Sequence, residues 1–415
     1  MNRAPIPRKG SAAAAFVAGG LLCLLTVPAC EQRPVERSKR LDRALDAATQ
    51  YLVAKQSADG AWRSETYGVL TDGVTLTPPV LKTLWLSPPS PETRAACGRA
   101  AAYLRGFVAE DGTISPETPL DYPVYSAAMA AIVFNRLLID SAGSTEANRT
   151  ARDAWLRHLR GFQVTEQLGW NPIDAGYGGW GYAVRPPHKP ESGRLPFVAD
   201  LSSTLFAVGA LRMSGVPASD PAFRAALVFV ERCQNFTDDS AQGDPAFDDG
   251  GFFFTAANRA QNKAGVAGTD RNGVLRYHSY GSATADGVRA LIRCGLGPDH
   301  PRVLAAQDWL RRHFSTHTNP GVFEPVLAAD RDAALNYWYW SVSHALRLLA
   351  VTTVDRDGLQ VAWAPWLADD LLARQRPDGS WKNPHGFMKE DDPLIATTLG
   401  AAALANCREV MRASK

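Results

Sequence analysis

Gln375–Trp381 reads QRPDGSW, and near the other end of the chain Gln56–Trp62 reads QSADGAW. Each stretch follows one apolar, helix-like run and precedes another. Asp-Gly favours a sharp turn, because glycine adopts positive φ without steric cost and aspartate bonds nearby backbone N–H groups. A buried Trp has one N–H that needs a partner, and the Gln amide can supply it. Two such joints framing the chain predict a repeat of helical pairs.

The residues between the two stretches contain further helix–elbow–helix units with less regular joints. The apolar spacing predicts six units, and the elbows of the third and fourth are the longest and the richest in glycine and aromatic residues. The units are Leu41–Leu86, Arg99–Leu138, Ala151–Leu211, Ala222–Gly295, Arg302–Leu349 and Trp363–Ala405.

The terminal units decide between an open and a closed arrangement of these pairs. An open solenoid needs polar capping repeats at both ends. Here the first and last units are the most apolar and regular, which favours a ring. Inner helices of a ring should be apolar on every side, as LGAAAL at Leu399–Leu404 is. The sequence therefore predicts an all-α fold, an (α/α)6 toroid.

Composition places few limits on function. Apolar residues make up 46% of the 415 residues and charged residues 21%, which is enough for a substantial core. The net charge of +2 gives no electrostatic reason to expect nucleic acid as a partner.

The N-terminus has the pattern of a targeting segment. A basic start precedes the apolar run Ser11–Leu25, which is too short for an ordinary transmembrane helix. Val27-Pro28-Ala29-Cys30 then resembles a bacterial lipobox, in which the cysteine is lipidated. We therefore expect a lipoprotein-type signal segment at 1–30, a polar tether at 31–40 and the toroid domain at 41–408. The protein would be exported and lipid-anchored through Cys30 to a bacterial membrane, on its periplasmic or cell-surface side. A plainly cleaved signal and an uncleaved anchor are the alternatives.

Four cysteines lie outside that segment, each without a CxxC partner. In an exported protein some could form disulfides, but the spacing does not select a pairing. Small buried thiols are the favoured interpretation. The four are Cys97, Cys233, Cys294 and Cys407.

QSADGAW and QRPDGSW resemble the QW motif of the prenyltransferase and squalene-oxidocyclase repeat family, in which Gln ends an outer helix and Trp stacks on it. The resemblance covers essentially the whole chain after residue 40. It implies an (α/α)6 toroid with its site in the central cavity, and it is strongest to the bacterial, often exported, single-toroid proteins of the family. The motif residues are Gln56, Gly60, Trp62, Gln375, Gly379 and Trp381.

One catalytic motif of that family is altered here. Squalene–hopene-type cyclases begin an inner helix with DxDDT, whose middle aspartic acid protonates the isoprenoid. Alignment on Thr204 matches the first acid with Asp200 but puts Ser202 and Ser203 in the other two positions. A serine hydroxyl is far too weak an acid to protonate an alkene. We therefore expect no class II protonation chemistry, and expect Asp200 to cap its helix with Ser203 sharing that role.

The metal-dependent branch of the family is also poorly matched. The resemblance implies zinc binding through Asp, Cys and His near Asp332–His344, where this chain has Tyr339 and Ser341 but no Cys. His313 and His317 could share a helix face, but the following Thr-Asn-Pro-Gly favours a helix end, where a cation suits the dipole. No Cys-Gly-Glu-Gln thioester run and no DDxxD occur. We expect neither a metal nor a cofactor.

Three acids are the candidates for catalysis, Asp286, Asp249 and Asp200. Asp249 and its neighbour Asp248 could act at a cavity mouth, or could form a turn, which is favoured. Asp286 lies inside a predicted inner helix where the pattern requires an apolar residue. It could be a buried acid with a raised pKa, or be paired with Arg289, which is favoured.

Aromatic residues gather in the third to fifth units. The family lines its cavity with such rings, whose faces stabilise cations, and the same rings could hold an uncharged lipid. Core packing is the alternative for some of them. The candidate cavity residues are Trp180, Tyr182, Phe252, Phe253, Tyr277, Tyr280, Tyr337, Trp338 and Trp340.

Three functions are consistent with these residues. The first is binding of an isoprenoid or other apolar small molecule in the toroid, without catalysis. The second is a terpenoid-cyclase-like or prenyl-transfer enzyme with an unrecognised acid. The third is an interaction module that uses the toroid faces.

Overall fold

The computed structural model describes residues 34–115, 120–140, 143–192, 197–239 and 242–413. Within these ranges the chain forms six pairs of α-helices, in which an outer helix precedes an inner one. The outer helices are α1 (Pro34–Ala54), α3 (Pro91–Arg105), α5 (Glu146–Arg160), α7 (Pro221–Arg232), α9 (Pro301–His313) and α11 (Trp363–Arg374). The inner helices are α2 (Thr77–Leu84), α4 (Pro123–Ile139), α6 (Leu201–Met213), α8 (Gly281–Cys294), α10 (Leu335–Leu348) and α12 (Pro393–Ala413).

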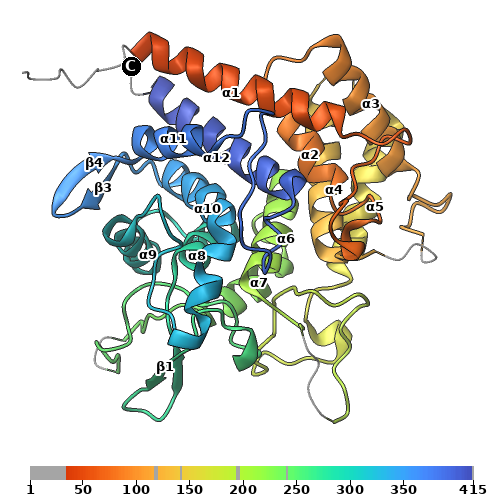
Figure 1. Cartoon of the computed structure of the whole chain (residues 1–415). Helices are drawn as coiled ribbons and strands as arrows, with labels where there is room; N and C mark the ends of the chain where they lie inside the picture. Colours follow the sequence, from red (N-terminus) through yellow and green to blue (C-terminus); the bar gives the residue numbers. More distant parts are fainter. Residues whose placement is uncertain (1–33, 116–119, 141–142, 193–196, 240–241, 414–415) are drawn as a thin grey trace, which may run out of the picture.

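The pairs close into a ring. Neighbouring inner helices pack on one another, and α12 also packs on α2, which joins the last pair to the first. Both ends of the described chain share one wall, because α1 lies against α11 and α12 (Figure 1). Nearly every residue of α6 from Leu201 to Leu211 is buried, as a helix enclosed by others requires. The predicted α/α toroid is confirmed.

Four elbows are held by the same glutamine contact. The Gln56 amide donates to the carbonyls of Gly60 and Ala96, both at 2.9 Å, and so ties its own elbow to the next outer helix. Gln375 does the same at the closing joint, donating to Gly379 O at 2.9 Å and to Ala44 O of α1 at 2.8 Å. Each amide therefore satisfies two buried carbonyls and fixes one unit to its neighbour. The other two glutamines are Gln163 and Gln234.

The tryptophans of these joints bond differently from the sequence prediction. Trp62 Nε1 donates to Leu52 O at 2.7 Å, and Trp381 Nε1 donates to Leu371 O at 2.9 Å. The indole thus pairs with a free carbonyl at the end of the preceding helix, and the glutamine is left for the next unit. The expectation of a Gln–Trp hydrogen bond is wrong.

Each joint is also bonded to its own inner helix through a threonine. The backbone N–H groups of Trp62, Trp180, Phe252 and Trp381 donate to threonine Oγ1 atoms, each at 3.0 Å. Phe252 therefore occupies in the fourth unit the place that Trp has in the others. The four threonines are Thr77, Thr204, Thr284 and Thr397.

Gly379 shows why these turns need glycine. Its φ is +87°, and a Cβ there would overlap the carbonyl of Ala47 on α1. Any other residue would separate the last elbow from the first helix, at the point where the ring closes.

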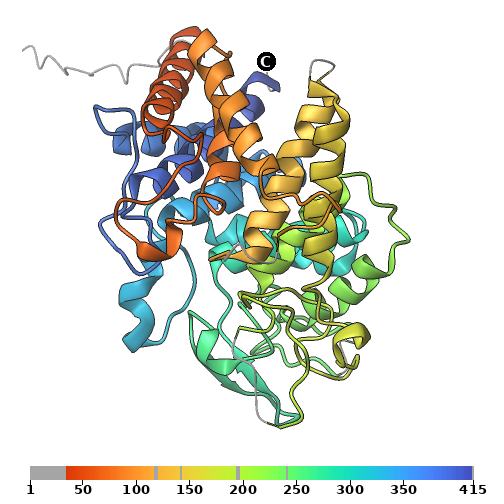
Figure 2. The same cartoon turned by 90° about the vertical axis from the view of Figure 1, so that its right-hand side faces the viewer.

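The longest elbows belong to the third and fourth units and lie together beneath the helices (Figures 1 and 2). They contain the 3-10 turns η3 (Glu166–Leu168) and η4 (Arg259–Gln261) and the antiparallel strands β1 (Val266–Thr269) and β2 (Leu275–Tyr277). The other short elements of the described chain are η1 (Gly68–Leu70), η5 (Pro325–Ala334) and a second hairpin, β3 (Thr353–Arg356) with β4 (Leu359–Ala362).

The predicted boundaries need two corrections. Most of the predicted tether, 31–40, is helical, because α1 begins at Pro34 and Arg37 forms an ion pair with Asp369 of α11. At the other end α12 continues past residue 408 to Ala413, where Arg412 pairs with Asp42. Residues 1–33, including Cys30, lie outside the described residues. Among the helices that the structure does describe, none has the length and apolar character needed to cross a bilayer.

All four cysteines outside the predicted signal segment are free thiols. Cys233 and Cys407 are buried, and Cys97 and Cys294 are half-buried. The prediction of small buried side chains is confirmed for the first two.

Candidate functional site

The ring encloses a cavity of about 880 Å³. Side chains from all six units line it, supplied by inner helices and by elbows. Such a volume suits a drug-sized or isoprenoid-sized molecule. Its apolar lining includes Leu70, Leu76, Pro79, Met129, Phe254, Leu327, Phe387, Met388, Ile395 and Leu399.

A continuous run of aromatic rings borders this space, and all of its members except Trp340 line the cavity itself. Tyr182 stacks on Tyr125 with ring centroids 5.7 Å apart, and Tyr125 lies 4.7 Å from Phe206. Phe206 then stacks on Trp340 at 5.2 Å, and Trp340 lies 5.3 Å from Tyr337. The wall therefore runs from α4 and the third elbow across α6 to α10, and it offers ring faces along the length of a ligand.

A polar recess of about 70 Å³ opens beside this wall. It shares Tyr125, Tyr182 and Tyr337 with the main cavity and adds Tyr280 and Asp286. Asp286, the acid that the sequence places within an apolar inner helix, therefore lines a recess beside the main cavity.

Asp286 is 2% exposed and has three polar partners. It accepts hydrogen bonds from Tyr337 OH at 2.8 Å and from Ser341 Oγ, and its Oδ1 lies 3.5 Å from Nη1 of Arg289. Burial raises the pKa of Asp286, while Arg289 and the two hydroxyls oppose that shift. The predicted pairing with Arg289 is confirmed, and Arg289 also lies over the Trp340 ring at 4.4 Å.

Asp200 caps α6, as predicted. Its Oδ1 accepts from Ser203 N and Ser202 Oγ, and its Oδ2 accepts from Ser203 Oγ, all at 2.8 Å. Burial raises the pKa of Asp200 to about 6. Tyr125 OH donates to Ser202 Oγ at 2.8 Å, so Ser202 connects the capping carboxylate to the polar recess. The three donors oppose the rise in the pKa of Asp200, because they stabilise the ionised carboxylate, which is the wrong form for protonating a ligand.

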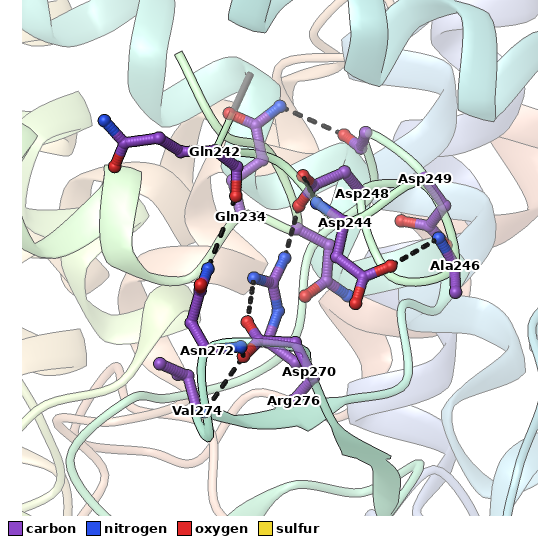
Figure 3. Close-up of polar contacts among 12 residues, drawn as sticks. Gln234, Gln242, Asp244, Ala246, Asp248, Asp249, Asp270, Asn272, Val274 and Arg276 are labelled. Atoms are coloured by element: carbon purple, nitrogen blue, oxygen red, sulfur yellow. Dashed lines mark hydrogen bonds and ion pairs between the residues drawn. The ribbon is translucent and has the colours of Figure 1, made fainter. Parts of the chain in front are cut away.

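Asp248 and Asp249 do not reach the cavity. Arg276 lies between Asp248 and Asp270, with Nη1 3.1 Å from Asp270 (Figure 3). Asp249 accepts from Gly251 N at 2.9 Å and also receives bonds from the Ser279 hydroxyl and an indole. Both acids organise the fourth elbow, so they form a turn, as the favoured interpretation predicts, and do not act at a cavity mouth.

Three of the predicted cavity rings belong instead to the joints between helices. Trp180 and Trp338 are fully buried, and each indole donates to a backbone carbonyl, that of Leu159 or Ser315. Phe252 is fully buried in the position that Trp180 has in the previous unit. These rings fill the core between outer and inner helices, because the repeat needs a large side chain there.

Phe253 and Tyr277 also lie away from the cavity. Their ring centroids are 5.0 Å apart, and they pack together within the fourth elbow. Of the predicted set, Tyr182 and Tyr337 line the main cavity, Tyr280 lines the recess, and Trp340 lines a second chamber of about 200 Å³.

The two histidines of the fifth unit have different surroundings. His313 ends α9, with Nδ1 2.8 Å from Trp309 O and its ring stacked on Trp309. His317 lies beyond the helix, with Nδ1 3.6 Å from Asp370. They do not share a helix face.

Sequence reasoning missed three residues of the site, Tyr125, Phe206 and Lys263. Tyr125 begins the second inner helix and Phe206 interrupts the small residues of the third, so both could have been found as large rings on inner helices. Lys263 comes from an elbow without periodicity, and no local pattern marks it.

Neither a protein-family model nor a curated protein sequence matches the chain. Solved structures do. A variant of the type II terpene cyclase MstE from Scytonema, in complex with merosterolic acid A (product), is 14% identical with a TM-score of 0.50, over 91% of this chain and 99% of that one. The GH76A α-1,6-mannanase from Salegentibacter sp. HEL1_6 is 10% identical with a TM-score of 0.53, over 89% of this chain and 99% of its own. At such identities the likeness shows the fold, an α/α toroid.

Proposed function

We propose that this protein binds an isoprenoid or a similar apolar molecule in the centre of its toroid. The observation that carries the proposal is the cavity of about 880 Å³, with its aromatic wall and its aliphatic lining from every unit. Burial of a ligand's apolar surface there would contribute roughly 25 cal/mol per Å² before the costs of association. The fold likeness to a terpene cyclase solved with its product supports a ligand in this position.

Binding without protonation is favoured over class II cyclisation. Ser202 replaces the protonating aspartic acid of the DxDDT motif in the alignment on Thr204. The Asp200 carboxylate accepts three hydrogen bonds as the cap of α6. Protonating an alkene needs a carboxylic acid that is held neutral and strongly acidic. We therefore propose that the protein belongs with the single-toroid relatives that lack the protonating acid.

Co-purification tests the proposal directly. The purified full-length chain is extracted with organic solvent and the extract is analysed by mass spectrometry, and a bound polyprenyl or similar apolar species is expected. Leu399→Trp fills the cavity and should reduce the recovered species about tenfold or more. Leu348→Trp adds the same ring at a residue that is 48% exposed, and it should retain the ligand. Equal recovery from both variants would place the ligand outside the ring.

An enzyme is the second candidate, because Tyr337 links Asp286 to the cavity at 2.8 Å. Turnover would be measured with squalene and with prenyl diphosphates, comparing the wild type with Asp286→Asn. Activity that the wild type shows and this variant lacks would replace binding by catalysis. An empty extract together with no apolar binding would favour the third candidate, an interaction module.

Mannanase chemistry has less support. The inactive variant of that enzyme, solved with α-1,6-mannotriose, has two adjacent aspartates replaced. In this chain Asp391 accepts from Tyr67 OH, and Asp392 caps α12 and accepts from Ser64 Oγ. Asp248 and Asp249 are engaged in the fourth elbow, so neither pair faces the predominantly apolar cavity.

We further propose a lipid anchor at Cys30 on an exported protein, on the basis of the sequence of residues 1–30. Cys30→Ala would then move the protein from the membrane fraction to the soluble fraction of the expressing bacterium. An unchanged distribution would contradict lipidation at this residue.

A further inference from the structure

Among the described residues that line the main cavity and the polar recess, Lys263 is the one basic residue that lines both. It lies in the fourth elbow just after η4, and its ammonium is 4.6 Å from the centroid of Phe254. The ammonium thus lies over a ring that also lines the cavity, and both residues border the space where a ligand would lie.

The turn that presents Lys263 is fixed on both sides. The side chain of Asn262 accepts from Thr255 N at 3.0 Å and donates to Thr255 O at 2.9 Å. On the other side Glu324 N donates to Ala264 O at 3.0 Å. Buried backbone held in this way places the amine with little conformational freedom.

Lys263 has no ion-pair or hydrogen-bond partner within the described part of the chain, where its ammonium makes a cation–π contact with Phe254. Three buried acids act on it from a distance, Asp200, Asp286 and Glu390. Burial lowers the pKa of Lys263, and these acids oppose that shift. The amine is therefore desolvated but unpaired.

The charge around Lys263 selects among ligand classes. A carboxylate or diphosphate placed against it would also meet the fields of Asp200, Asp286 and Glu390. A neutral carbonyl avoids that repulsion. Its imine, once protonated, keeps the positive charge that the three acids favour.

We propose that Lys263 captures the aldehyde or ketone group of an apolar ligand as a Schiff base; this deepens, and rests on, the proposed ligand cavity. The neutral amine adds to the carbonyl carbon, the resulting carbinolamine loses its hydroxyl as water, and a C=N bond replaces C=O. No oxidant or reductant is needed. The phenols of Tyr125 and Tyr337 line the same recess, and burial raises their pKa well above the usual value, so they stay protonated. Either phenol would donate to the carbonyl oxygen by turning its O–H away from its present acceptor, Ser202 or Asp286.

The test traps the imine. Full-length protein is incubated with farnesal and sodium cyanoborohydride, digested and analysed by mass spectrometry. One reduced adduct per chain is expected on Lys263, about tenfold or more above the label on exposed Lys189, because binding raises the effective concentration of the aldehyde. Excess farnesol should prevent the adduct by occupying the cavity.

Two variants separate the lysine from the cavity. Lys263→Arg keeps the charge but cannot form an imine, and it should lose the adduct while binding farnesol as the wild type does. Lys55→Arg, at an exposed lysine outside the cavity lining, should keep both. Wild-type protein that binds farnesol but gives no adduct, or equal labelling of Lys263 and Lys189, would overturn the Schiff base and leave the proposed function intact. Absence of farnesol binding would instead overturn the proposed function itself.

Discussion

The two terminal elbows and the two central elbows make the same bonds with very different lengths of chain. In the first and last units Gln and Trp stand close together, at Gln56–Trp62 and Gln375–Trp381. In the third unit Gln163 makes the same two carbonyl contacts, but Trp180 follows only after a long insertion. The joint is therefore independent of the chain length between its parts.

This difference separates the parts of the elbow that build the ring from those that build the site. The inserted and following residues of the central elbows supply Tyr182, Phe254 and Lys263 to the cavity. The compact terminal joint closes the ring against α1, and the residues after it add Phe387 and Met388 to the cavity. Four perturbations test this division, from the largest expected effect to the smallest.

Replacing a joint tryptophan should have the largest effect in either kind of elbow. Trp381→Ala and Trp180→Ala remove fully buried rings with satisfied indoles, and each should lower the free energy of unfolding by about 3–5 kcal/mol. Urea denaturation measures it. Phe387→Ala, in the same elbow as Trp381 but 62% exposed, is the control and should cost within about 0.5 kcal/mol. A small effect at Trp180 alone would show that the long elbow does not depend on its joint.

Replacing a joint glutamine should come next. Gln375→Leu and Gln234→Leu each remove two hydrogen bonds to buried carbonyls, at an expected cost of about 1–3 kcal/mol in unfolding free energy. The control is Gln242→Leu, an exposed residue of the fourth elbow. If only Gln375→Leu were destabilising, the central glutamine contacts would be dispensable and the comparison would fail.

The pH dependence of stability should reveal the protonation of Glu390, a buried acid of the last elbow. Glu390 accepts four hydrogen bonds from Asn336, Tyr337 and Asn383, and burial raises its pKa from 4.5 to about 7. Because the pKa of Glu390 is higher in the folded protein than in the unfolded chain, the folded protein binds this proton more tightly. The stability that Glu390 contributes is therefore present below pH 4.5 and is lost as the pH rises towards 7. The stability advantage of the wild type over Glu390→Ala should therefore shrink by roughly 1–2 kcal/mol between pH 4.5 and 7.5.

Denaturation curves at both pH values give that difference, and exposed Glu65→Ala should show no such trend. An advantage that grows with pH would mean that the four donors hold Glu390 as a carboxylate despite its burial.

The smallest effect is expected at the ion pair that attaches the start of α1. Arg37 and Asp369 have side chains that are 27% and 49% exposed, with a 3.2 Å contact. Arg37→Ala should lower unfolding free energy by about 0.5 kcal/mol, less at high salt. A loss like that of Trp381→Ala would show that closure depends on charge rather than on the buried joint.

The sequence predicted what local spacing controls. Helical periodicity located the six units, and each of them contains one outer and one inner helix. The terminal Gln–Trp joints were visible because their parts are close in the chain. Gln163 and Gln234 were missed because the insertions separate them from their partners.

The site was harder to predict for the same physical reason. Trp180 and Phe252 carry the joint of their units, so they face the core although they stand among the aromatic residues of the long elbows. Tyr125 and Phe206 face the cavity because of the side of the inner helix on which they lie. Lys263 is placed by contacts between remote segments, such as Glu324 with Ala264, and no local pattern encodes these.

Calorimetric titration of the full-length protein with farnesol tests the central claim most directly. Saturable binding of one farnesol molecule per chain is expected, with a negative heat-capacity change, because apolar surface is removed from water inside the ring. The heat of binding should be lost in Leu399→Trp but not in Leu348→Trp. A titration without saturable heat, or one that is unchanged in Leu399→Trp, would contradict an apolar ligand held within the toroid.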